Sequence, residues 1–121
     1  MAKRPTSELP DDHRRCRGVF DGVTDDGMSF RLEVRQASRR LGSGELVRQQ
    51  IRSMTRGRPM TSGDLYKDVV EISLFIPNRH RADIEILPSG MYRHGRHVER
   101  SLRAVVESML DETAPRSGPR P

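Results

Sequence analysis

The chain has 121 residues, a formal net charge of +5 and no tryptophan. Only Lys3 and Lys67 are lysines, so 20 of its 22 basic residues are arginines, which form paired hydrogen bonds to phosphate and favour a nucleic-acid partner. A single cysteine excludes an intramolecular disulfide, and no apolar run approaches the length of a membrane span. We therefore expect a cytoplasmic protein that contacts no membrane and needs no cofactor.

The two ends of the chain differ in composition from its middle. Residues 1–17 hold two prolines and almost no apolar side chains, and residues 113–121 read TAPRSGPRP. Segments of this kind have too little apolar surface to offset the entropy lost on ordering. We predict a flexible tail over residues 1–17, one folded domain over residues 18–112, and a disordered tail over residues 113–121.

The first predicted elements are two strands and a turn. Residues 28–36, MSFRLEVRQ, alternate apolar and polar side chains, which predicts a half-buried strand. The preceding segment RGVFDGV predicts a shorter strand, paired with the first through a turn at Asp25, Asp26 and Gly27.

A helix is predicted next, with Ser43 as its N-cap and Gly57 just beyond its end. Its apolar residues are spaced i, i+4, i+7 and predict a buried stripe of Val47, Ile51 and Met54. A second row, also spaced by four, consists of Arg48, Arg52 and Arg56. Like charges in one row repel one another unless an anion meets them, so the row predicts either a phosphate-binding surface or a solvated face.

The second half of the chain predicts a hairpin and a final helix. Residues 69–76 and 82–87 alternate in the manner of strands, with a polar turn between them. Residues from His97 to Asp111 carry a predicted buried stripe at helical spacing, which consists of Val98, Leu102, Val105 and Met109. The order β-α-β-β-α predicts an α+β domain, with a small, mainly antiparallel sheet and both amphipathic helices packed on one face.

The start of that final helix has an unexpected charge. Residues 90–103, GMYRHGRHVERSLR, contain six Arg or His residues, although a helix N-terminus favours anions. A phosphate bound at this point would remove the conflict, because the backbone N–H groups and the arginines would share it.

Five segments of the chain together resemble a known family. They are the strand MSFRLEVRQ, the helix SGELVRQQIRSMTRG, the strand pair VEISLFI and ADIEILPSG, and the helix HVERSLRAVVESMLDE. Their order is similar to that in the RNA-silencing suppressors of tombusviruses and aureusviruses, and the mass of 13.8 kDa suits the shorter, fourteen-kilodalton aureusvirus type. The resemblance implies a viral, non-enzymatic homodimer that sequesters double-stranded small interfering RNA through its sugar-phosphate backbone and so suppresses RNA silencing. Without tryptophan, the chain departs from the relatives that measure duplex length by stacking.

The predicted RNA-binding residues are arginines drawn from every element, namely Arg31, Arg35, Arg48, Arg52, Arg56, Arg79, Arg81, Arg93, Arg96, Arg100 and Arg103. The polar face of the predicted sheet also carries four carboxylates, those of Glu33, Glu71, Asp83 and Glu85. They would repel phosphates unless they pair with arginines. We expect the homodimer interface at the strand 82–87 or at the final helix, since the core is small for a monomer.

Three alternatives stay open. Asp83 and Glu85 could serve a small metal-dependent nuclease or junction resolvase. Zinc could be bound by the thiolate of Cys16 and the imidazoles of His13, His94 and His97. The chain could also be a protein-binding dimerisation module whose arginines only provide a basic surface. Salt-dependent binding of duplex RNA would distinguish an RNA-binding protein from such a protein-binding module.

Overall fold

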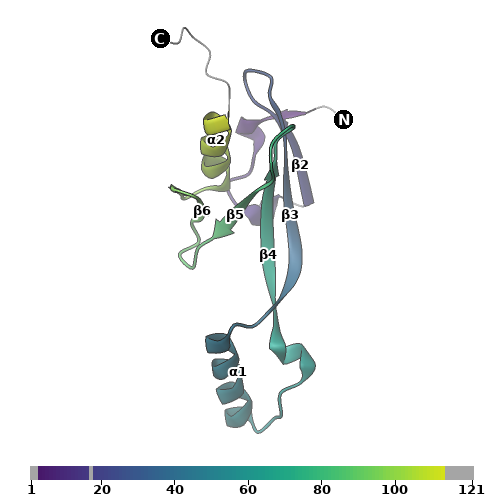
Figure 1. The fold of residues 1–121 in the computed structure, drawn as a ribbon, viewed down its shortest axis with the longest axis vertical. Coiled ribbons are helices and arrows are strands. Elements are labelled where there is room, and N and C mark those ends of the chain that lie inside the picture. The colour runs from purple at the N-terminus through teal and green to yellow at the C-terminus, as the bar shows by residue number, and fades with distance from the viewer. Residues whose placement is uncertain (1–2, 17, 114–121) are drawn as a thin grey trace. The chain divides into compact units, whose positions relative to one another are not determined.

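The computed structural model describes residues 3–16 and 18–113 of the chain. They divide into two compact units. The sheet unit comprises residues 1–35 and 71–121, and the insert comprises residues 36–70. Figure 1 shows both units, with labels on helices α1 and α2 and on strands β2 to β6. The predicted α+β class is confirmed, since strands and helices both occur in one chain.

The described part of the chain forms a seven-stranded sheet in which the strands follow one another in chain order. These strands are β1 (Arg4–Pro5), β2 (Gly18–Val23), β3 (Ser29–Arg40), β4 (Tyr66–Phe75), β5 (Ala82–Ile86), β6 (Tyr92–His94) and β7 (His97–Glu99). β1 pairs parallel to β2, so the sheet is mixed. The prediction of a small, mainly antiparallel sheet with the order β-α-β-β-α is therefore wrong. It missed β1, β6 and β7, which are too short to show a periodic pattern.

The two hairpins expected from alternation are present. β2 and β3 are antiparallel with Phe20 opposite Leu32, and β4 and β5 are antiparallel with Ile72 opposite Ile84. Gly27 closes the first turn at φ +88°, a conformation that side chains disfavour. All four paired side chains are at most 5% exposed, so the apolar positions of these strands do form the core.

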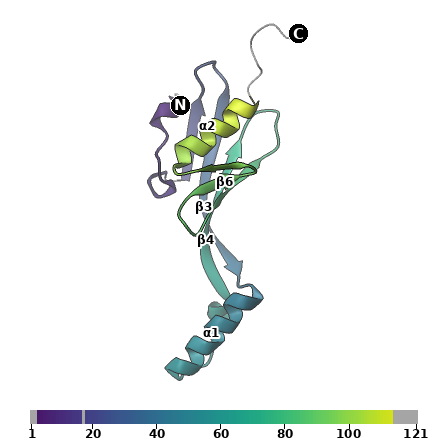
Figure 2. The same ribbon diagram turned by 90° about the vertical axis from the view of Figure 1, so that its left-hand side faces the viewer.

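Helix α2 (Leu102–Thr113) lies across the sheet of its unit, as Figure 2 shows. Five of its side chains are buried, those of Leu102, Val105, Val106, Met109 and Leu110. The predicted start at His97 is wrong, because residues 92–99 fold into the β6–β7 hairpin. Gly95 has φ +57° in its turn, which a continuous helix would not allow. Val98, predicted to be buried in the helix, lies on β7 with 43% exposure.

The core also includes residues from the segment predicted to be a flexible tail. Leu9 is fully buried, Cys16 is 6% exposed, and the backbone N–H of Leu102 donates to the carbonyl of Asp11 at 2.7 Å. Two short 3-10 helices, η1 (Thr6–Glu8) and η2 (His13–Arg15), carry this segment past α2. Because it contributes few apolar side chains, its sequence lacks the periodicity that marks a packed element. The predicted C-terminal tail lies outside the described residues from position 114 onward.

The insert contains helix α1 (Ser43–Arg56) and the 3-10 helix η3 (Ser62–Leu65), together with one end each of β3 and β4. α1 has the predicted bounds, although Gly42 rather than Ser43 is its N-cap, and Gly57 ends it at φ +67°. The backbone N–H of Leu41 donates to the carbonyl of Leu65 at 2.9 Å, which joins the two segments that flank α1 and η3.

The buried stripe predicted for α1 is wrong. Val47, Ile51 and Met54 are 53%, 58% and 81% exposed, and α1 has no buried residue. The half-buried side of the helix is polar apart from one leucine, and consists of Glu45, Leu46, Gln49 and Ser53. Amphipathic spacing identified the helix correctly, but it could not identify which side contacts the rest of the chain.

Candidate nucleic-acid interface

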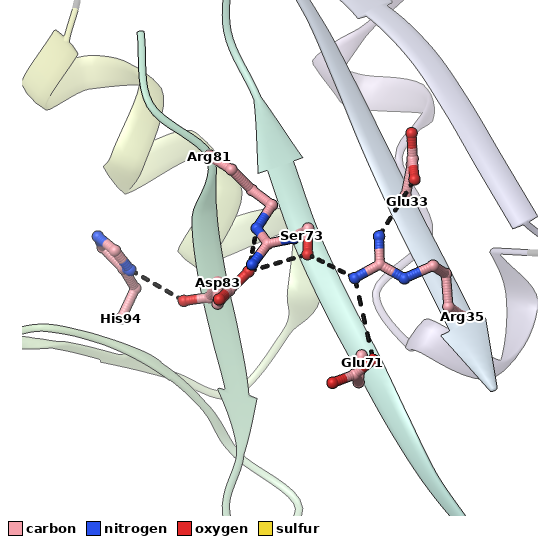
Figure 3. A network of polar contacts seen from close by, with 7 residues as sticks. All are labelled: Glu33, Arg35, Glu71, Ser73, Arg81, Asp83 and His94. Atoms are coloured by element: carbon pink, nitrogen blue, oxygen red, sulfur yellow. Dashed lines mark hydrogen bonds and ion pairs between the residues drawn. The ribbon is translucent and has the colours of Figure 1, made fainter. Parts of the chain in front are cut away.

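The arginines on the polar face of the sheet unit are engaged with carboxylates of that unit. Figure 3 shows the central network, in which the guanidinium of Arg35 donates to the hydroxyl of Ser73 at 3.2 Å. Ser73 donates in turn to Asp83 at 2.9 Å, and Arg81 contacts the same carboxylate at 3.2 Å. Arg35 also pairs with Glu33 at 3.3 Å. The network crosses three neighbouring strands, and in it both Arg35 and Arg81 are paired with carboxylates of the same unit.

Two further arginines pair directly across the strands. Arg31 lies opposite Asp21, and its Nε donates to the carboxylate at 2.8 Å. Arg93 lies opposite Glu85, and its Nε donates at 3.0 Å. The hydrogen bond from Arg31 holds the pKa of Asp21 below its usual range. Opposite charges at directly paired positions attract each other, so each of these arginines forms an ion pair inside the sheet.

The carboxylates that conflicted with an RNA-binding sheet face therefore have a structural explanation. Glu33, Glu71, Asp83 and Glu85 each lie within 4.0 Å of an arginine nitrogen. Sequence reasoning identified both sets of charges but had no strand register with which to pair them. This face is close to neutral, and it is a weaker candidate for phosphate contact than its arginine content suggests.

The basic segment 90–103 does not form an anion site at a helix start. Arg93 is paired in β6, Arg96 lies in the β6–β7 turn, and Arg100 precedes α2 in chain order. The N-terminus of α2 is already capped, since Ser101 Oγ accepts from the N–H of Ala104 at 3.0 Å. Arg103 donates to the carbonyl of Leu9 at 2.8 Å and so fastens the N-terminal segment. Placing the helix start five residues too early overstated the conflict with the helix dipole, because Arg96 lies in the β6–β7 turn, although Arg103 remains in the first turn of α2.

The imidazoles of this segment also have partners in the sheet unit. His97 Nε2 lies 2.5 Å from Glu112, and His94 Nδ1 lies 3.1 Å from the carbonyl oxygen of Asp83. Cys16 is buried, which raises the pKa of its thiol. Among the described residues, no group of three or more His, Cys, Asp or Glu side chains is arranged to hold a metal ion. The four residues of the zinc alternative are therefore not brought together.

The insert differs from the sheet unit in charge. It holds seven of the 22 basic residues and three of the 17 acidic ones, so it carries +4 of the net charge of +5. Arg48, Arg52 and Arg56 are exposed on α1, and none of them has a carboxylate within 4.0 Å in the part of the chain that the structure describes. Arg79, Arg96 and Arg100 of the sheet unit also lack such a carboxylate among the described residues, but they lie on separate segments, whereas the three arginines of α1 lie in one row on one helix.

An open pocket of about 290 Å³ lies beside this row, wholly within the insert. Arg48, Arg52, Tyr66 and Lys67 contribute to its lining. Lys67 forms an ion pair with Glu45, which also accepts from the N–H of Gly42 at 3.2 Å. The hydrogen bond from Lys67 is the main cause that lowers the pKa of Glu45, and the charge of Arg48 adds to it. The pocket lining therefore contains three cations, Arg48, Arg52 and Lys67, and two carboxylates, Glu45 and Asp64.

The sheet unit has its own open pocket, of about 370 Å³, with the opposite character. Four carboxylates contribute to its lining, those of Asp25, Asp26, Glu107 and Asp111. A phosphate backbone would be repelled there, which again directs an anionic partner toward the insert.

Within the described residues, no helix has the length and apolar character needed to cross a membrane. Comparison of the chain with protein-family models, with curated proteins and with solved structures finds no match.

Proposed function

We propose that the protein is a non-enzymatic binder of double-stranded RNA that contacts the sugar-phosphate backbone through the insert. The observation that carries the proposal is the row of exposed arginines on one helix, Arg48, Arg52 and Arg56, in a unit that carries +4 of the net charge of +5. Successive members of the row are about 6 Å apart along the helix axis. A flexible guanidinium adapts to phosphates at such spacings and bonds them through two N–H groups.

The preference for a duplex rests on what the insert offers besides charge. Binding of single strands usually needs aromatic rings on which successive bases stack, and Tyr66 is the only aromatic residue of the insert. Backbone recognition of an A-form duplex needs cations and hydrogen-bond donors and acceptors, including groups that contact the 2′-hydroxyls. Arg48, Arg52 and Gln49 around the pocket supply such groups.

Sequestering small duplex RNAs, and thereby suppressing RNA silencing, is the biological role that the resemblance of the sequence would give to this activity. In that role the bound RNA is held and released intact, in the cytoplasm of a host cell. The nuclease alternative is less favoured, because Asp83 and Glu85 are paired with Arg81 and Arg93 and no third carboxylate joins them in the described structure.

The test compares two variants with equal loss of charge. One carries Arg48→Gln, Arg52→Gln and Arg56→Gln in the insert; the matched control carries Arg79→Gln, Arg96→Gln and Arg100→Gln in the sheet unit. All six arginines are exposed, and none has a carboxylate within 4.0 Å among the described residues. Fluorescence anisotropy with a short labelled RNA duplex then gives the affinity of each protein.

We expect the insert variant to bind roughly 10 to 100 times more weakly, at about 0.5–1 kcal/mol for each lost ion pair. The control should lose several-fold at most, through the change in net charge alone. Equal losses in both variants, or tighter binding of a single strand than of the duplex, would overturn the proposal.

A further inference from the structure

The exposed apolar residues of α1 form a narrow seam. Val47, Ile51 and Met54 are spaced by four and then three residues, the spacing of a helix-pairing seam. At about 100° per residue they fall within an arc of about 60°. A helix that packs on a core or lies on a lipid surface shows a wider apolar arc of about 100° or more, so the narrow seam favours another helix as its partner.

The opposite side of α1 already has contacts within the insert. The half-buried residues Leu46, Gln49 and Ser53 lie roughly 110–170° around the helix from the centre of the seam. The rest of the insert therefore contacts the side of α1 opposite the seam. The seam stays exposed after these contacts have formed.

A second copy of α1 would fit this seam best in the antiparallel orientation. An open pocket of about 440 Å³ lies at the C-terminal end of the seam, and Met54, Pro59 and Met60 are among its lining residues. Antiparallel pairing brings Val47 of one copy beside Met54 of the other, next to that pocket. Parallel pairing would place the two pockets side by side and leave both unfilled, which makes it the poorer fit.

Charge determines when such a pair can form. The two-fold axis of an antiparallel helix pair is perpendicular to both helices, so the same flank of each copy lies on the same side of the pair. Arg48 and Arg52 of both copies would then form one basic surface. These charges repel each other in free solution, and a phosphate backbone on that side would neutralise them.

The small size of the seam also indicates that the helices pair only when both copies are bound to RNA. Three side chains per copy expose much less than the roughly 800 Å² per partner that a stable interface buries. A contact this small becomes effective when both partners are already held on one ligand, because the second step is then intramolecular.

We propose that α1 of one copy pairs antiparallel with α1 of a second copy when both are bound to the same RNA duplex. The pairing makes binding cooperative along the duplex, and it rests on the proposed function. It replaces the dimer contacts expected from the sequence. The strand 82–87 is paired on both sides within its own sheet, and the apolar face of α2 is buried in its own unit.

Two duplexes separate the inference from the proposed function. A short duplex that accommodates one copy measures RNA binding alone, and a duplex of twice that length measures binding and pairing together. Wild-type protein should occupy the long duplex cooperatively, with the second copy bound roughly tenfold more tightly than the first. The variant Ile51→Gln with Met54→Gln should retain its affinity for the short duplex and lose the cooperativity.

A matched control lowers surface hydrophobicity elsewhere. Val19 and Val98 are exposed residues of the sheet unit, at 47% and 43%, so Val19→Gln with Val98→Gln should leave cooperativity unchanged. Failure of the wild type to bind the short duplex would refute the proposed function. Normal binding to the short duplex with non-cooperative binding to the long one would refute the pairing alone.

Cross-linking gives the orientation. In the antiparallel pair Ile51 lies near the two-fold axis, so Ile51→Cys should form a disulfide between copies on the long duplex under mild oxidation. Ser53→Cys, on the opposite side of α1, should not. Cys16 is buried, so it can be left in place. Equal cross-linking of Ile51→Cys without RNA, or preferential cross-linking through Ser53→Cys, would contradict the proposal.

Discussion

The sheet unit and the insert use charge and burial in opposite ways. The sheet unit holds 15 basic and 14 acidic residues and all the buried side chains of the described chain. The insert holds seven basic and three acidic residues, and none of its residues is buried. On the polar face of the sheet unit, Arg31, Arg35, Arg81 and Arg93 pair with carboxylates, and the arginines that stay unpaired lie on separate segments. The insert instead leaves a row of arginines and a stripe of apolar side chains exposed on one helix. A basic composition taken over the whole chain hides this division.

The largest expected difference between the units concerns the core. Leu102 is fully buried in α2, and Leu102→Ala should lower the free energy of unfolding by about 2–5 kcal/mol. Ile51→Ala removes the same kind of side chain from an exposed position of α1 and should cost at most about 0.5 kcal/mol. Urea denaturation of both variants measures the two effects. Similar losses would mean that the insert is packed more tightly than its exposure indicates.

A smaller effect is expected from the charge network of the sheet unit. Ser73 is 1% exposed and links Arg35 to Asp83. Ser73→Ala removes that link, and we expect a loss of about 1–2 kcal/mol in the free energy of unfolding. Thr61→Ala, which removes an exposed hydroxyl of the insert that contacts Asp64 at 3.2 Å, should cost less. Chemical denaturation that ranks these two variants in the reverse order would contradict the distinction between the units.

Acid should affect the local structure of the insert. The pKa of Glu45 is lowered chiefly by its hydrogen bond from Lys67, and that of Asp64 by the backbone N–H of Thr61. For a carboxylate with a depressed folded-state pKa, the stabilisation is present above the unfolded value and is lost as the pH falls through the folded one. Amide exchange in α1 should therefore accelerate as the pH falls below about 4.5, after correction for intrinsic exchange. Glu45→Gln should weaken this dependence, and an unchanged profile would count against the contact.

The smallest expected effect is on the RNA itself. Incubation of duplex RNA with the protein and Mg²⁺ or Mn²⁺ should leave its length unchanged, because Asp83 and Glu85 are held by arginines. Denaturing electrophoresis measures this directly. Cleavage that Asp83→Asn abolishes would establish the nuclease alternative instead.

The sequence predicted those parts of the fold that rest on local periodicity. The alternation around Phe30 and Leu32 located the β2–β3 hairpin, and the spacing between Ser43 and Gly57 gave the bounds of α1. The β6–β7 hairpin was missed, because its strands have three residues each and Val98 of β7 continues the helical spacing of Leu102 and Val105.

The candidate site was predictable only in part, for a related reason. The arginine row of α1 follows from spacing within one helix, and it was identified in full. The pairing of Arg31, Arg35 and Arg93 depends on which strand positions lie opposite one another, and no local pattern specifies that. The exposure of Ile51 likewise depends on which side of α1 meets the rest of the insert. Both facts belong to tertiary structure and become accessible only with coordinates.

The salt dependence of RNA binding tests the division of charge between the two units most directly. Each phosphate contact that is lost should flatten the plot of log affinity against log salt concentration by roughly 0.7–0.9. The variant Arg48→Gln, Arg52→Gln, Arg56→Gln should therefore lower the slope for a short RNA duplex by roughly 2–3. The control Arg79→Gln, Arg96→Gln, Arg100→Gln should leave it nearly unchanged. A slope that falls equally in both variants, or only in the control, would contradict the assignment of RNA binding to the insert.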